Sequence, residues 1–248
     1  MIRKIVRNEN DQETYFISLN DFLVGLLFIF IVLLMTYSLI FQDSVDQLNK
    51  QLNERMELRT ALLKRIQVKL EKGGYQAEVV ANEGVLRLPE GVLFEPGQAR
   101  LGQRAQGALS IIAGELAAEL PCFGARRNNS TCPSSSGPIL EAVYVEGHTD
   151  DLPINTAQFR SNWELSSARS IATYNYLIDV ERTLSKLPNA SGTATLLGAS
   201  AYADTRPVAK VANPAAGHRQ KNRRVDFRFL LSPPSDQEVQ AAAETAAQ

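Results

Sequence analysis

Hydrophobic and polar positions are divided unevenly along this chain. Residues 22–41, FLVGLLFIFIVLLMTYSLIF, form a run of twenty residues without a formal charge. At about 1.5 Å per residue, a helix of this length spans about 30 Å, the thickness of the hydrocarbon core of a membrane. The charged segment that starts at Gln42 follows directly, without the small-residue cleavage site of a signal peptide. We therefore predict one uncleaved transmembrane helix after a short N-terminal segment, residues 1–21.

The segment after this run has helical periodicity. Residues 42–72 contain neither Pro nor Gly, and Gly73-Gly74 marks the end of the pattern. Apolar side chains recur 3, 4 or 7 residues apart, which places them on one stripe of a helix. That stripe must be buried, either in a parallel coiled coil with a second copy or against the chain's own C-terminal domain, and Arg59 interrupts it. We predict a helical linker over residues 42–74. Its stripe consists of Val45, Leu48, Leu52, Met56, Leu63, Ile66 and Leu70.

The remaining chain mixes the two periodicities. Strands that alternate with two long helices favour an α/β (α+β) sandwich over residues 75–232, with the helices on one face of a small sheet. Residues 233–248 contain almost no core-forming side chains, and we expect a disordered tail. The pattern predicts a hairpin over 78–88 that turns at 82–84, strands over 143–146, 195–199 and 225–231, and helices over 103–120 and 163–180.

Charge limits the possible functions but does not orient the membrane helix. The 26 Lys and Arg residues nearly balance the 27 Asp and Glu residues, which argues against a nucleic-acid-binding protein, because phosphate contacts need a basic excess. Basic residues flank both ends of the apolar run in equal number, so the positive-inside rule gives no orientation. These residues are Arg3, Lys4 and Arg7 before it and Lys50, Arg55 and Arg59 after it.

The two cysteines supply the missing orientation. Cys122 and Cys132 lie in the Pro-, Gly- and Asn-rich segment PCFGARRNNSTCP, whose ends a disulfide would join. In the chain-entropy model such a short bridge stabilises a fold by about 2–3 kcal/mol. Disulfides persist outside the cytoplasm, so we predict a periplasmic C-terminal domain and a cytoplasmic N-terminus at the inner membrane. Two unrelated thiols are the alternative, and the spacing fits no common metal signature.

Asp21 lies at the cytoplasmic end of the apolar run. A carboxylate at the centre of a bilayer costs up to about 2.5–3.5 kcal/mol, and less at this depth. The cost falls on the ionised form, which favours a carboxyl group that takes up and releases a proton. One charge that crosses 100 mV releases about 2.3 kcal/mol, enough to drive such a cycle. Ser18 and Asp21 also have the spacing of a capping box, so Asp21 could instead cap the start of the helix.

Charged residues in three motifs predict a binding cleft. The motifs are VEGHTDD at 145–151, SNWELSSARS at 161–170 and KNRRVDFRF at 221–229. Asp150 follows a predicted strand, Arg169 lies on a predicted helix, and Arg223 and Arg224 lie in a basic turn. Such groups around one cleft could hold a zwitterion, because Asp binds an ammonium group and Arg binds a carboxylate. A salt-bridged surface is the alternative.

These motifs resemble a known family. GHTDD, SNWELSSAR and NRRV together resemble the OmpA-like peptidoglycan-binding domain over about residues 85–231, and SNWELS is most similar to MotB-type stator proteins. The membrane helix preceded by ISLND resembles the span of the same proteins, whose Asp carries the ion. The resemblance implies that Asp150 and Arg169 bind the diaminopimelate group of the peptidoglycan stem. It further implies that Thr149, Asn162, Leu165 and Arg223 line the site and that Asp21 carries the proton.

The resemblance also implies partners. MotB-type proteins form homodimers inside a pentamer of a MotA-like membrane subunit, and ion flow powers the rotation of that pentamer. The short chain, the sequence GLLFIFIVLLM of its span, and the cysteine-closed loop at 121–138 are more similar to the ZorB subunit of Zorya anti-phage systems, whose partner is ZorA. Defence, flagellar motility and a passive peptidoglycan tether therefore remain open.

An enzyme that acts on peptidoglycan ranks last. Asp150 and Asp151 have no evident partner carboxylate for glycoside cleavage, and His148 with His218 makes no recognisable zinc set. We expect no metal and no cofactor. The sequence does not separate H⁺ from Na⁺ as the conducted ion.

Overall fold

The computed structural model describes residues 2–125, 132, 139–208 and 216–246. The chain divides into two compact units, one of residues 1–52 with 234–248 and the other of residues 53–233. Helix α1 (Ile2–Lys72) contributes residues to both units. It ends immediately before Gly73, as the sequence predicts, and Gly74 has a positive φ of 79° that favours glycine.

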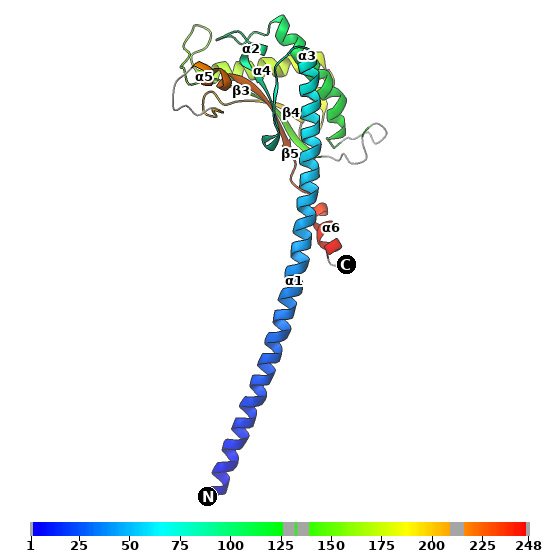
Figure 1. Ribbon diagram of the computed structural model, residues 1–248, viewed down its shortest axis with the longest axis vertical. Helices are drawn as coiled ribbons and strands as arrows, with labels where there is room; N and C mark the ends of the chain where they lie inside the picture. The colour runs from blue at the N-terminus through cyan, green and yellow to red at the C-terminus, as the bar shows by residue number, and fades with distance from the viewer. Residues whose placement is uncertain (1, 126–131, 133–138, 209–215, 247–248) are drawn as a thin grey trace. The chain divides into compact units, whose positions relative to one another are not determined.

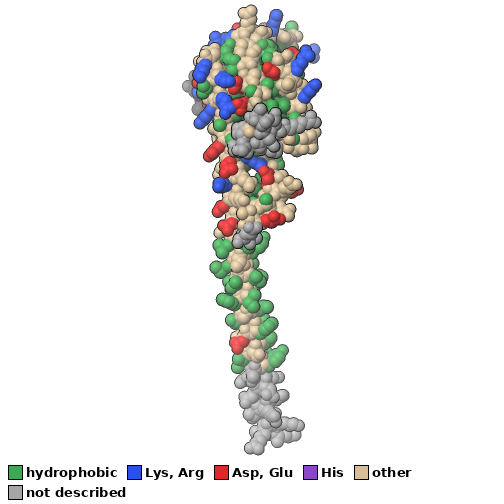
Figure 2. Space-filling model, turned by 90° about the vertical axis from the view of Figure 1, so that its right-hand side faces the viewer, with side chains coloured by type: hydrophobic (Ala, Val, Ile, Leu, Met, Phe, Trp, Pro, Cys, Tyr) green, Lys and Arg blue, Asp and Glu red, His purple; other side chains and the backbone are tan. Residues whose placement is uncertain are grey.

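The apolar part of α1 belongs to the first unit. Within the described residues this is the one helix long and apolar enough to cross a membrane. Its large hydrophobic side chains from Tyr15 to Phe41 are all exposed, and Figure 2 shows them on the visible face of that stretch. A helix that is hydrophobic on every side suits contact with lipid rather than with water.

The second unit contains one five-stranded sheet in the order β1-β2-β5-β3-β4. The parallel pair β3–β4 lies at one edge, and the other neighbours are antiparallel. The predicted hairpin is confirmed as β1–β2, and Gly84 in its turn has a left-handed φ of 65°. The strands are β1 (Glu78–Val80), β2 (Val85–Pro89), β3 (Leu140–His148), β4 (Leu197–Ala201) and β5 (Arg224–Leu231).

Helices α3 (Gln103–Glu119) and α4 (Asn162–Val180) cover one face of this sheet, as Figure 1 shows. Alternate residues of β5 separate the two faces: Val225, Phe227 and Phe229 pack in the apolar core beneath the helices, whereas the polar side chains between them point away. The α+β fold class is therefore as predicted. Shorter helices are α2 (Glu90–Leu93), α5 (Ala216–Asn222) and the 3₁₀ turns η1 (Ala81–Glu83), η2 (Leu120–Cys122) and η3 (Arg182–Lys186).

The last turns of α1 are part of this core. Leu63, Ile66 and Leu70 are completely buried, and Arg59 donates hydrogen bonds to the carbonyl oxygens of Phe229 (3.3 Å) and Ala81 (3.1 Å). The second unit accordingly begins at residue 53 rather than 75, and the helical segment predicted over 42–74 contributes residues 53–72 to it. The apolar stripe is the reason, because its second half packs against the chain's own domain.

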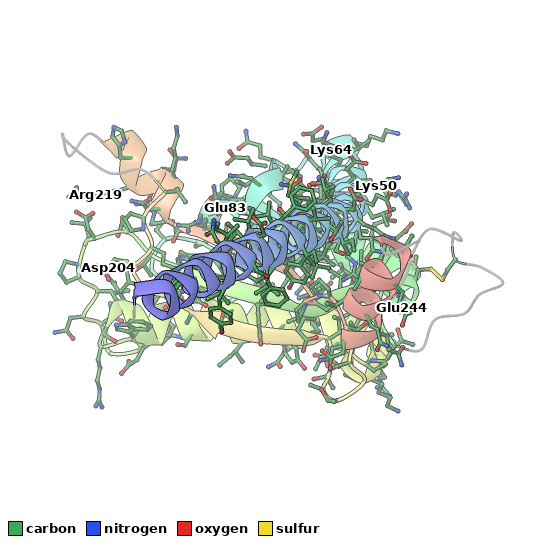
Figure 3. All side chains as sticks on the ribbon, turned by 90° about the horizontal axis from the view of Figure 1, so that it is seen from below. Lys50, Lys64, Glu83, Asp204, Arg219 and Glu244 are labelled. Atoms are coloured by element: carbon green, nitrogen blue, oxygen red, sulfur yellow. A yellow bond between two sulfur atoms is a disulfide. The ribbon has the colours of Figure 1, made fainter. Side chains whose placement is uncertain are left out.

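Two further expectations concern the ends of the domain. Cys122 and Cys132 form the predicted disulfide, visible as the yellow bond in Figure 3. The tail expected to be disordered instead contains helix α6 (Asp236–Ala246). The Ser235 hydroxyl accepts the Glu238 amide and the Glu238 carboxylate accepts the Ser235 amide, a capping box that starts a helix despite the few apolar residues.

Truncation of Ile66 tests whether the end of α1 stabilises the domain. We expect Ile66→Ala to lower the free energy of unfolding by about 2–5 kcal/mol, because it leaves a cavity at a completely buried position. Val68→Ala is the matched control, since Val68 is 47% exposed on the same helix. Denaturant unfolding of the full chain in detergent, followed by circular dichroism, measures both. Equal effects of the two substitutions would contradict this packing.

Candidate functional site

Four elements of the second unit meet at the C-terminal end of β3. Thr149 and Asp150 directly follow this strand, and the amino end of α4 lies beside it. Gly147 permits the close approach, because a Cβ atom there would overlap the carbonyl oxygen of Ser166 on α4. Ser161 caps α4 by accepting the amide of Glu164 at 3.3 Å. Glu90 at the start of α2 and Arg223, directly after α5, complete the site.

Four charged side chains form one connected network, here named the site network: Glu90, Asp150, Arg169 and Arg223. Arg223 donates from Nη1 to Asp150 Oδ2 (2.7 Å) and from Nε to Glu90 Oε2 (2.6 Å). Arg169 donates from Nη2 to the other oxygen of Glu90. Two carboxylates and two guanidinium groups thus neutralise one another in a largely buried place.

The two arginines differ in access. Arg169 is 1% exposed, donates from Nε to the Gln98 carbonyl oxygen at 2.8 Å, and has its guanidinium carbon 5.3 Å from the centre of the Phe94 ring. Burial lowers the pKa of Arg169. The side chain of Arg223 is 31% exposed, and although burial opposes it, hydrogen bonds to Asp150 and Glu90 raise the pKa of Arg223. Arg223 is therefore the guanidinium group that solvent reaches.

The other predicted residues surround this network. Asn162 donates to the carbonyl oxygens of Asp150 (3.2 Å) and Leu152 (3.0 Å), which fixes the loop that carries Asp150. Leu165 is buried at the same end of α4. The Thr149 amide donates to the Ala203 carbonyl at 2.8 Å, whereas its buried hydroxyl has no hydrogen-bond partner among the described residues. The structure thus brings together all six residues predicted for the cleft.

Sequence reasoning missed Glu90. This residue is 6% exposed, binds both arginines through its side chain, and donates its backbone amide to the Arg223 carbonyl at 2.9 Å. The predicted cleft contained one carboxylate for several arginines, and a buried arginine requires a counter-charge. This excess of arginines indicated that a further acidic residue was needed. It did not indicate which acidic residue of the chain supplies the negative charge.

Asp21 lies in the first unit, within α1. The helix begins at Ile2 and continues without interruption through Ser18 and Asp21. The capping interpretation of Asp21 is therefore wrong, because a capping box requires a free helix start at Ser18. The side chain of Asp21 is exposed, next to the apolar run.

Comparisons with known proteins agree with this architecture. No protein-family model matches the chain. It is 28% identical to Uncharacterized protein YtxE of Bacillus subtilis over 249 residues, 89% of this chain and 90% of that protein. It is also 35% identical to Motility protein B of Bacillus subtilis over 88 residues, which are 36% of this chain and 30% of that protein.

A solved structure identifies the fold. A putative MotB-like protein from Desulfovibrio vulgaris superimposes with a TM-score of 0.52 at 22% identity, over 73% of this chain and 98% of that one. The chain has a MotB-like fold. The OmpA-like domain predicted from the three motifs is thereby supported.

A second charged cluster lies on the sheet face of this MotB-like fold that points away from α3 and α4. His148 Nε2 is 3.8 Å from a Glu146 oxygen and 3.7 Å from an Asp226 oxygen, a spacing that could hold a metal ion. Three guanidinium groups already bind the two carboxylates, however, so a metal cation would increase an existing positive excess. We therefore assign this cluster to the stability of the sheet. The arginines are Arg87 and Arg224 on Asp226, and Arg228 on Glu146.

We expect His148 to make the stability of the domain pH-dependent. Burial lowers the pKa of His148 below its ordinary value of 6.5, and the nearby charge of Arg224 acts in the same direction. The folded state keeps the ring neutral while the unfolded state takes up a proton, so the free energy of unfolding should fall as the pH falls below 6.5. The slope should reach up to about 1.4 kcal/mol per pH unit.

His148→Phe tests this assignment, since it keeps a ring beside Tyr202, whose ring centre lies 5.5 Å away. The variant should have a flatter pH dependence of unfolding between pH 7 and 5.5. His218→Phe is the matched control and should retain the wild-type slope. Equal slopes for wild type and His148→Phe would contradict the role given to His148.

Proposed function

We propose that this protein is a membrane-anchored stator subunit of an ion-driven motor. One observation carries the proposal: a paired Asp–Arg site on a MotB-like fold belongs to a chain whose first unit has one membrane-length helix with an acidic residue at its end. The second unit would hold the cell wall, and the first would conduct protons together with a MotA-like membrane subunit. By the resemblance to MotB-type proteins, the chain would form a homodimer within a pentamer of that partner.

The site network suits the diaminopimelate residue of the peptidoglycan stem. The free end of this residue carries an ammonium group and a carboxylate. Asp150 would accept the ammonium group, and Arg223 and Arg169 would bind the carboxylate. Asn162 would act indirectly, because it fixes the loop of Asp150. Thr149 would offer its hydroxyl, which has no partner in the described part of the chain, and Leu165 would pack beneath the site.

The disulfide supports the proposed topology. A Cys122–Cys132 bridge persists outside the cytoplasm, so the second unit would lie in the periplasm and the N-terminus in the cytoplasm. A single-pass protein of the inner membrane follows from this arrangement. Asp21 would then lie at the cytoplasmic side of the bilayer.

Two biological settings fit this function. We propose anti-phage defence as a ZorB-like subunit with a ZorA-like partner, on the sequence of the membrane span and the cysteine-closed loop. The second candidate is flagellar-type motility, which the 35% identity to Motility protein B over 88 residues favours. Deletion of the gene in its own host separates them, because loss of phage resistance supports the first setting and loss of swimming supports the second.

Asp150→Asn tests peptidoglycan binding. The amide keeps the shape of the carboxylate but removes the charge that would bind the ammonium group, so affinity for purified sacculi should fall at least about tenfold. Asp151→Asn is the matched control, since Asp151 is the next residue and pairs with Arg219 of α5, labelled in Figure 3. Co-sedimentation of the full chain in detergent measures both. Equal binding by wild type and Asp150→Asn would refute the site.

Asp21→Asn tests ion conduction. Because an amide cannot carry a proton, the variant should abolish the flux that the chain and its MotA-like partner produce in proteoliposomes, while wall binding stays unchanged. Asp43→Asn, at the other end of the apolar run, is the control and should retain flux. A wild-type complex that binds sacculi without any flux would instead indicate a passive tether.

A further inference from the structure

Glu90 is paired with both guanidinium groups of the site network. Each of its two oxygens binds a different arginine, Oε1 to Arg169 and Oε2 to Arg223. Its backbone amide is also fixed, on the Arg223 carbonyl. The guanidinium groups expected to bind the ligand are therefore already paired with a carboxylate of the chain itself.

The charges of the network add to zero. Glu90 and Asp150 contribute two negative charges, and Arg169 and Arg223 contribute two positive charges. Three of these side chains are more than nine-tenths buried, so a ligand that changes the net charge of the site is strongly disfavoured. Without Glu90 the same site would carry a net positive charge and would attract any carboxylate.

Ligand binding then becomes an exchange of partners. A ligand carboxylate can take a guanidinium group only if the carboxylate it displaces obtains another cation, and a ligand ammonium group supplies one. A zwitterion satisfies both requirements at once. A plain carboxylate leaves Glu90 without a partner, and a plain amine adds a positive charge to a neutral site.

We propose that Glu90 is the specificity-determining residue of this site, which it restricts to groups that carry an ammonium and a carboxylate together. This inference rests on the proposed binding of the diaminopimelate group. It gives a role to Glu90, which lies outside the three motifs. It also explains why the site should reject simple anions of the cell wall.

Competition for wall binding tests the inference. The full chain in detergent is bound to purified sacculi and displaced with meso-diaminopimelate, with pimelate, which lacks the amines, or with 1,5-diaminopentane, which lacks the carboxylates. Wild type should prefer diaminopimelate over both. The preference is the ratio of the concentrations of two competitors that displace half of the bound protein. For Glu90→Gln the ratio of pimelate to diaminopimelate should fall at least about tenfold, because the site becomes net positive and binds a plain carboxylate better.

Arg223→Gln is a second variant, and it changes the net charge of the site network in the opposite direction. The side chain of Arg223 is exposed enough to tolerate replacement. This substitution leaves the network with a net negative charge, which favours a plain amine. The preference for diaminopimelate over 1,5-diaminopentane should therefore become smaller. Glu115→Gln is the matched control, since Glu115 is another buried acid, paired with Lys69 away from the site, and its preferences should equal those of wild type.

The outcomes separate the two proposals. If wild type binds sacculi and both variants change preference in the stated directions, the role of Glu90 is supported. If wild type binds but the preferences of Glu90→Gln and Arg223→Gln match those of wild type, the role of Glu90 is refuted while wall binding stands. If wild type does not bind sacculi or respond to diaminopimelate, both proposals are refuted.

Discussion

The paired burial of opposite charges is the constraint on which the second unit depends. Arg169 is almost completely buried, and its guanidinium group is tolerated there because Glu90, two backbone carbonyls and the Phe94 ring surround it. A buried ion pair contributes little net stability, but the loss of one partner is strongly destabilising. The site network is thus held in one arrangement, because any other arrangement would leave a buried charge without its partner.

Two such networks lie on either side of one short segment. The consecutive residues Arg223 and Arg224 point to different partners: Arg223 binds Glu90 and Asp150 in the site network, and Arg224 binds Asp226 beneath the sheet. His148 and Asp150 stand two residues apart at the end of β3 and divide between the same networks. The segment that carries Arg223 and Arg224 is therefore held by ion pairs in both networks.

Helix α1 is shared by the two units. Asp21 lies directly before its apolar run, and its last turns supply Leu63, Ile66 and Leu70 to the core of the second unit. No Pro or Gly interrupts the helix between residues 26 and 72. The helical segment that the sequence pattern predicted after the apolar run is thus part of one continuous helix, α1.

The sequence by itself determined the features that depend on local periodicity and residue type. The membrane-length helix, the hairpin, α3, α4 and the disulfide follow from runs of apolar residues, turn residues and two cysteines in a short loop. Asp150, Arg169 and Arg223 were also recognisable, because they stand in compact motifs. Only the tertiary structure decided that Glu90 neutralises both arginines, that residues 53–72 belong to the second unit, and that the helix continues through Ser18. Each of these depends on which distant segments meet, and pairing between residues 79 and 133 positions apart leaves no periodic trace in the chain.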